Sequence, residues 1–208
     1  MSAPYPALSA TLDRIRELIA ICNKSHDEVL NVRRLSHLAG LSKSDVEILL
    51  AGGVPPETDP DVMVRDRVRF LYETHIGANG RRREIPSIAA GIGQTPTWTK
   101  KLVAGEAKPN ILVGAQLADF YDVSPSFFTD LPAKALDREL QSILFDLEIE
   151  ADPGRTLQEL GVRHISGRSR SMNKGELAEL AKMVANITDE LTQVKNQMER
   201  LENPEGNR

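Results

Sequence analysis

The feature that most constrains the fold is an apolar repeat near the C-terminus, where apolar residues recur at alternating spacings of three and four over four heptads. They are Leu177, Leu180, Val184, Ile187, Leu191, Val194, Met198 and Leu201. This is the spacing of the a and d positions of a coiled coil, so it predicts one long helix with a narrow apolar seam. Because the rest of that helix is mostly polar, we expect the seam to pair two chains as a homodimer. The alternative is an amphipathic helix that folds back on its own domain.

The remainder of the chain also favours helices. No segment of useful length alternates apolar and polar residues as a half-buried strand does. Only 4% of the residues are aromatic, which suits helices packed through Leu, Ile, Val and Ala. The segment 54–60 (VPPETDP) is expected to be a stiff linker, because proline fixes the backbone and removes a hydrogen-bond donor. We therefore predict an all-α chain whose first internal boundary lies near residue 61.

Residues 85–109 have the internal spacing of a helix-turn-helix, in which two short helices cross at a tight turn. Ile88 and Ala89 supply the packing pair of the first helix, and Gly91–Gln94 makes the turn. Leu102 anchors the second helix to the core. The outer face of this second helix would then be free to enter the major groove of DNA. The other interpretation is a tight pair of helices within an ordinary helical core.

The expected DNA contacts lie on the second helix and in the basic segments beside it. They are Thr95, Thr97, Trp98, Lys100, Lys101, Arg81, Arg82, Arg83 and Lys108. Lysine and threonine side chains contact phosphates or base edges, and arginines grip phosphates at the groove edge. Thr95 or Thr97 is also expected to cap the second helix. Two alternatives stay open: Trp98 contacts DNA or is half-buried at an interface, and the arginine triplet grips phosphate or is a solvated loop.

The charge distribution singles out the same part of the chain. The net charge is −4, which does not indicate a nucleic-acid binder by itself. Residues 62–130 carry 9 basic and 7 acidic side chains, whereas residues 1–61 carry 6 and 9 and residues 131–208 carry 11 and 14. A small DNA-binding module within an acidic chain fits this pattern.

A second, weaker helix-turn-helix pattern occupies residues 31–52. Asn31 is placed to cap its first helix, Leu35 and Ser36 take the packing positions, and the segment 40–42 makes the turn. Both patterns end in Ala-Gly, which hints at an internal duplication. The outward positions of the N-terminal pattern are Lys43, Ser44, Asp45 and Glu47. Because carboxylates facing phosphates are unfavourable, this part is expected to serve in packing or in protein contact.

Three stretches of the chain resemble a known family. They are GIGQTPTWTKKLVAG (91–105), LADFYDVSPSFFTD (117–130) and GVRHISGRSRSMNKGELAELAKMV (161–184). Residues 62–130 resemble the λ-repressor-like (XRE) helix-turn-helix domain, and 62–187 resemble the EspR-type nucleoid-associated regulators of mycobacteria and related actinobacteria. The resemblance implies DNA binding through the helix at 96–104, dimerisation through the C-terminal part, and broad regulation. Residues 1–61 depart from the pattern, because those regulators begin near the equivalent of Val62.

The resulting expectation has three parts. Residues 1–61 form an N-terminal helical unit with a degenerate helix-turn-helix, 62–131 a λ-repressor-like DNA-binding domain, and 132–208 a C-terminal helical dimerisation domain. The predicted function is a dimeric transcriptional regulator or nucleoid-associated protein that binds double-stranded DNA. The alternative is an antitoxin-like or sigma-partner regulator in which the acidic residues 1–61 bind another protein.

Other functional classes find little support in the sequence. The four histidines are scattered, and no spacing is typical of a metal site, so neither a metal nor a cofactor is expected. No catalytic constellation is recognisable, so we do not expect an enzyme. The single cysteine, Cys22, cannot form an internal disulfide. With no apolar run of membrane-spanning length and no signal peptide, we expect a cytoplasmic protein located at the nucleoid.

Overall fold

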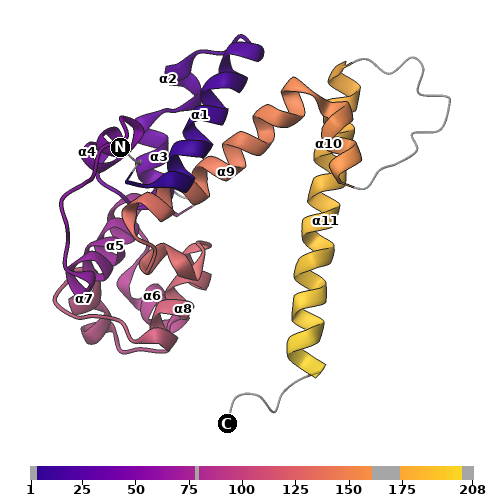
Figure 1. Ribbon diagram of the computed structural model, residues 1–208. Helices are drawn as coiled ribbons and strands as arrows, with labels where there is room; N and C mark the ends of the chain where they lie inside the picture. Colours follow the sequence, from indigo (N-terminus) through magenta and orange to yellow (C-terminus); the bar gives the residue numbers. More distant parts are fainter. Residues whose placement is uncertain (1–3, 78–79, 161–173, 203–208) are drawn as a thin grey trace.

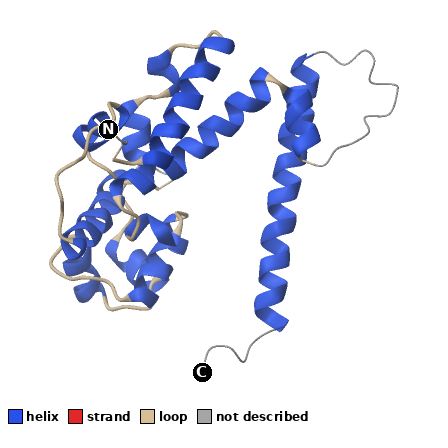
Figure 2. Cartoon of the chain, viewed as in Figure 1, coloured by secondary structure: helices blue, strands red, loops and turns tan. Residues whose placement is uncertain are grey.

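The computed structural model describes residues 4–77, 80–160 and 174–202 (Figure 1). Within these ranges the chain is built from helices and their connecting loops and contains no strand (Figure 2). The predicted all-α class is therefore confirmed. The helices pack into three hydrophobic clusters, which follow one another roughly in chain order.

The first cluster is built on the N-terminal helices. They are α1 (Pro6–Ile21), α2 (His26–Val29), α3 (Val32–Ala39) and α4 (Lys43–Leu50). The buried face of α1 presents Leu8, Leu12, Ile15 and Leu18 at helical spacing, so one side of the helix is apolar throughout. These side chains pack with the buried residues of α3 and α4.

The second cluster is formed by the middle of the chain. Its elements are α5 (Pro60–Thr74), α6 (Ile85–Gly91), α7 (Pro96–Val103), α8 (Ile111–Tyr121) and the 3₁₀ helix η1 (Pro125–Phe128). Proline stands in the first turn of α5, α6 and α7, where its missing N–H has no intrahelical partner to lose. Phe127 and Phe128 of η1 close the core of this unit.

The helix α9 (Pro132–Ala151) differs from its sequence-based assignment. The sequence analysis placed it in the C-terminal region, residues 132–208. Its buried side chains between Ala133 and Leu147 instead belong to the same hydrophobic cluster as those of α1, α3 and α4. In Figure 1, α9 runs alongside α1 before it leaves the N-terminal unit. The reason is that α1, α3 and α4 leave an apolar face uncovered, and α9 covers it. Residues 4–50 therefore complete their core with a helix more than 80 positions further along the chain.

The C-terminal helices form the third cluster, where α10 (Pro153–Glu159) and the start of α11 (Lys174–Glu202) pack against the end of α9. Leu177, Leu180 and Val184, the first part of the predicted seam, are half-buried in this cluster. The next seam residues are exposed: Ile187 by 57%, Leu191 by 65% and Val194 by 51%. Helix α11 extends past the body of the molecule (Figure 1). The described side chains do not include those of Met198 and Leu201.

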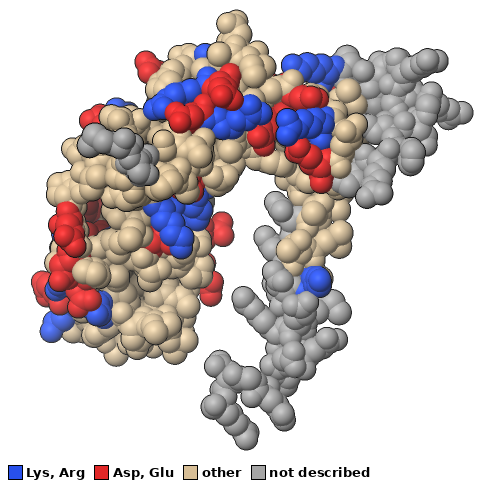
Figure 3. Space-filling view, in the orientation of Figure 1, with Lys and Arg blue, Asp and Glu red and all other residues tan. Residues whose placement is uncertain are grey.

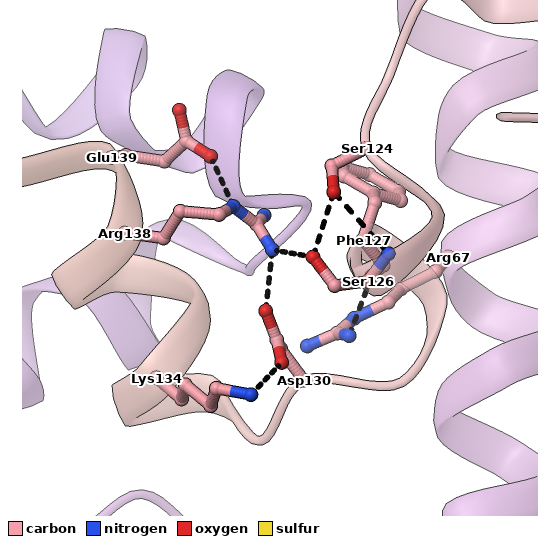
Figure 4. Close-up of polar contacts among 8 residues, drawn as sticks. All are labelled: Arg67, Ser124, Ser126, Phe127, Asp130, Lys134, Arg138 and Glu139. Atoms are coloured by element: carbon pink, nitrogen blue, oxygen red, sulfur yellow. Dashed lines mark hydrogen bonds and ion pairs between the residues drawn. The ribbon is translucent and has the colours of Figure 1, made fainter. Parts of the chain in front are cut away.

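A charged cluster around the buried Asp130 joins the middle unit to α9 (Figure 4). Asp130, only 5% exposed, forms ion pairs with Arg138 and with Lys134 Nζ, the latter at 2.8 Å. Burial disfavours its charge, but the hydrogen bond from Lys134 and the charge of Arg138 hold the pKa of Asp130 below its ordinary value. Beside it, the Arg67 Nη1 donates to the carbonyl of Phe127 at 2.6 Å. Burial lowers the pKa of the Arg67 guanidinium to about 10.

The N-terminal and middle units touch through aromatic rings. The imidazoles of His37 on α3 and His75 at the end of α5 stack at 4.3 Å between centroids. Phe70, Tyr121 and Phe127 surround His75 at centroid distances of 6.3 to 6.4 Å. Burial, and secondly the charge of His37, lowers the pKa of His75 to about 4. His75 is therefore neutral at neutral pH.

Candidate nucleic-acid interface

The α6–α7 pair is formed by short-range interactions in its turn. Ile88 and Ala89 on α6 are buried as the sequence predicts. Gly93 takes the left-handed backbone conformation, with φ of 61°, which turns the chain from one helix to the next. The Thr95 hydroxyl then caps α7 by accepting the N–H of Trp98 at 3.3 Å. Of the two caps that the sequence allowed, Thr95 is the one used.

Helix α7 is anchored by its inner face. Leu102 is completely buried, as predicted, and Thr99 is completely buried beside it. The Thr99 hydroxyl donates to the carbonyl of Thr95 at 3.0 Å, so its polar group is satisfied inside the protein. Sequence reasoning missed Thr99, because a threonine at this position is equally compatible with the outer face of a helix.

An arginine from α5 braces the C-terminal end of α7. Arg69 donates through Nη2 to the carbonyl of Ala104 at 3.1 Å and pairs with Asp66 at 3.2 Å. A cation here satisfies a free helix-end carbonyl and opposes the negative end of the helix dipole. Gly105 lets the guanidinium approach, because a Cβ atom there would lie 2.2 Å from the Arg69 Nη2. The sequence analysis did not identify this brace.

The outward face of α7 carries three of the expected contact residues. Thr97, Lys100 and Lys101 are exposed, and the lysines lie in the last turn of the helix. Trp98 is half-buried and packs on the middle core, which favours the packing alternative for its indole ring. Neither lysine forms an ion pair with a residue that the structure describes. Two cations and a hydroxyl therefore face solvent from a rigidly held helix.

The arginine triplet lies directly before α6. Arg81, Arg82 and Arg83 are all exposed. The guanidinium carbon of Arg82 lies 5.7 Å from the centre of the Tyr72 ring, and that of Arg83 lies 5.6 Å from the centre of the Phe120 ring. Such cation–π contacts orient a guanidinium without neutralising its charge. The two arginines thus remain available to an anion.

Lys108 differs from the other expected contacts. Its Nζ forms an ion pair with Asp61 at the start of α5, at 2.7 Å. The hydrogen bond from Lys108 holds the pKa of the Asp61 carboxyl below its ordinary value. Both partners are exposed, and exposed pairs contribute little stability. The structure thus gives Lys108 a partner within the chain, which the sequence analysis did not foresee.

The N-terminal α3–α4 pair repeats the local design. The Asn31 side chain caps α3 by accepting the N–H of Arg34 at 3.0 Å, and Leu35 and Ser36 are buried, all as predicted. Ser36 Oγ also donates to the carbonyl of Leu41 at 2.6 Å across the turn. Residues 31–52 therefore form two short helices joined by a tight turn, as the sequence pattern predicts.

In the part of the chain that the structure describes, no group of three or more His, Cys, Asp or Glu side chains is arranged to hold a metal ion. No helix within the described ranges is long and apolar enough to cross a membrane. Burial raises the pKa of the Cys22 thiol, whose Sγ lies 3.8 Å from the carbonyl of Leu147.

Comparison of the chain with protein-family models, with curated proteins and with solved structures gives no match. The likeness to EspR-type regulators stays a prediction from three sequence stretches. The first part of the third stretch, residues 161–173, lies outside the described residues.

Proposed function

We propose that the chain is a DNA-binding regulator in which α6 and α7 form a helix-turn-helix and α7 enters the major groove. The observation that carries the proposal is the two-sided character of α7. Its inner face is fixed by Leu102 and Thr99, while its outer face presents Thr97, Lys100 and Lys101 to solvent. A rigid helix with unpaired outward cations matches what groove binding requires.

The other basic residues would hold the duplex backbone. Arg82 and Arg83 are oriented by aromatic rings and lie next to the start of α6, which crosses the backbone in this docking mode. Lys100 and Lys101 contact phosphates or guanine edges, and Thr97 contacts base edges. Trp98 supports α7 from its inner side. The broad regulation implied by the family resemblance would fit a set rich in phosphate contacts.

The proposed active form is a homodimer. The first part of the seam is used within the chain, against α9 and α10, while Ile187, Leu191 and Val194 are exposed on α11. A second α11 packed along these residues would bury them. Pairing two chains doubles the number of recognition helices and raises affinity through effective concentration.

The test is the Lys100→Ala/Lys101→Ala variant, measured for binding to a random-sequence duplex over a range of salt concentrations. Each lost phosphate contact lowers the slope of log affinity against log salt by about 1, so we expect a drop of about 2 with weaker binding at every salt concentration. Lys174→Ala/Lys182→Ala, which removes two exposed lysines of α11, is the matched control. Wild-type protein that fails to bind duplex at low salt would overturn the proposal.

A further inference from the structure

Residues 13–52 and 66–105 share one framework at a constant offset of 53 positions. The sequence Asp-Arg-Ile-Arg at 13–16 is repeated as Asp-Arg-Val-Arg at 66–69. Helix α4 (Lys43–Leu50) and helix α7 (Pro96–Val103) begin and end at equivalent positions, and so do the ends of α1 and α5, at Ile21 and Thr74. The hint of duplication in the paired Ala-Gly ends is thus supported along the whole unit.

The helix-end brace is repeated with its contacts. Arg16 pairs with Asp13 at 2.8 Å and donates through Nη2 to the carbonyl of Leu50 at 3.1 Å. Its equivalent, Arg69, makes the same two kinds of contact with Asp66 and with the end of α7. An arginine from the first long helix therefore holds the C-terminal end of the second short helix in both copies.

The turn is repeated as well. Gly40 has a φ of 64° and Gly93 a φ of 61°, and the next helix is capped by Ser42 in one copy and by Thr95 in the other. After the helix, Gly52 and Gly105 have φ values of 80° and 78°. The N-terminal copy therefore presents α3 and α4 in the arrangement in which the middle copy presents α6 and α7.

The outward residues are where the copies differ. Glu47 and Ile48 stand at the positions of Lys100 and Lys101, so α4 does not offer the same cations from its last turn. Cations instead lie at the starts of the two helices, where Arg33, Arg34 and Lys43 are all exposed. Asp45 lies beside Lys43 in the first turn of α4, so the two helices together carry three positive and two negative charges, a net of +1.

These three cations have no ion pair with any described residue. Within residues 4–77 and 80–160, eight other Lys and Arg side chains form ion pairs with carboxylates. The paired ones are Arg14, Arg16, Lys24, Arg69, Lys108, Lys134, Arg138 and Arg155. Figure 3 shows positive and negative side chains intermixed over the face formed by α1, α9 and α10. Five cations without an ion pair to a described residue, Arg33, Arg34, Lys43, Lys100 and Lys101, lie on the two helix pairs.

We propose that the N-terminal α3–α4 face is a second DNA-contacting surface, which binds phosphates through Arg33, Arg34 and Lys43. The proposal rests on the proposed function of α6–α7. In helix-turn-helix docking the first helix crosses the backbone and the start of the second helix approaches the groove, which are the places where these cations lie. With Glu47 and Ile48 in place of the two lysines, this face adds affinity without reading sequence.

The test compares Arg33→Ala/Arg34→Ala with the parent protein on random-sequence duplex over a range of salt concentrations. Loss of two phosphate contacts lowers the salt slope by about 2. The sequences enriched from a random pool should stay the same, because α7 still reads them. Lys174→Ala/Lys182→Ala is again the charge-matched control and should keep the parent slope. Both arginines are exposed, so the variant is expected to fold, which circular dichroism and thermal unfolding check.

The outcomes separate the two proposals. Parent protein that does not bind duplex overturns the function proposed for α6–α7. If the parent binds and Lys100→Ala/Lys101→Ala weakens it, but Arg33→Ala/Arg34→Ala keeps the parent slope, the second surface is wrong and the function stands. The α3–α4 face would then be expected to bind a protein partner instead. Altered sequence enrichment in the arginine variant would overturn the sequence-independent role.

Discussion

At the scale of single residues, the two turn glycines are equivalent in backbone but not in surroundings. Gly40 and Gly93 have nearly the same positive φ, which L-residues adopt at a cost. A Cβ atom at Gly93 would meet only the end of Gln116, at 3.9 Å. A Cβ atom at Gly40 would lie 2.3 Å from the ring of Phe127, which is buried between the two units. The N-terminal turn therefore also serves as a contact with the middle unit.

This difference predicts unequal effects of the same substitution. Gly93→Ala should lower the free energy of unfolding by about 1 to 2 kcal/mol, the cost of the left-handed conformation. Gly40→Ala should add an overpacking cost of about 1 to 3 kcal/mol, because Phe127 must move. Urea denaturation of the two variants measures the difference. Equal losses would show that the Phe127 contact is not close in solution.

The protonation of His75 makes the stability of the fold depend on pH. Its pKa is about 4 in the folded chain, lowered first by burial and then by the charge of His37, against about 6.5 in an unfolded chain. Between these values the unfolded state binds more protons, so stability contributed by neutral His75 is present above pH 6.5 and is lost as the pH falls toward 4.

We therefore expect the urea midpoint to decrease over this pH interval, and to decrease less in His75→Gln. His26→Gln, which changes an exposed histidine, is the control and should follow the parent. A histidine NMR titration gives the direct measurement. A His75 resonance that titrates above pH 6 contradicts the buried, neutral state of His75.

At the scale of secondary-structure elements, α7 separates the residues that build it from those that face outward. Thr95 and Thr97 are both exposed threonines near its start, and both were expected at the DNA surface. Only Thr95 has its hydroxyl committed to the cap, where it accepts the N–H of Trp98. The two positions therefore have different expected roles although their chemistry is the same.

Alanine substitutions test this division. Thr95→Ala should lower the stability by about 1 kcal/mol through loss of the cap. Thr97→Ala should leave stability nearly unchanged and weaken binding to selected sequences, since its hydroxyl is free to contact bases. Thermal unfolding and duplex binding of both variants provide the measurement. Reversed effects, with Thr97 needed for stability, would contradict the assignment of the cap.

At the scale of the whole molecule, α9 and α11 decide how the parts are connected. Helix α9 completes the N-terminal core at one end and joins the α10–α11 cluster at the other. Deleting α11 would remove Leu177 and Ala181 from a packed cluster as well as the exposed seam. A point substitution in the exposed part of the seam is therefore the sharper test of dimerisation.

We expect Ile187→Glu/Leu191→Glu to make the proposed dimer monomeric without unfolding the chain, because both side chains are exposed in the single chain. Asn186→Glu/Thr192→Glu adds the same charge to exposed positions outside the seam and should remain dimeric. Light scattering after size-exclusion chromatography measures the mass. A monomeric parent, or a seam variant that stays dimeric, would contradict the proposed pairing.

Short-range features of this protein could be predicted from its sequence alone. The all-α class, the α6–α7 and α3–α4 pairs, the caps Asn31 and Thr95, and the buried Ile88, Ala89 and Leu102 all follow from patterns within a few residues. Helix periodicity and capping are local, because a helix satisfies its backbone within one turn and its ends through neighbouring side chains. The 53-residue repeat was also present in the sequence, in the repeated Asp-Arg-x-Arg motif.

Only the tertiary structure decided which surfaces meet. Helix α9 covers α1, Arg69 braces α7, Lys108 pairs with Asp61, and Phe127 fills the space over Gly40. Each contact joins residues far apart along the chain, and each partner is one of several chemically suitable residues. An amphipathic pattern in the sequence predicts that one face of a helix is buried, but it does not determine which other helix packs on that face. Packing of complete helices, with their particular shapes and charges, makes that choice.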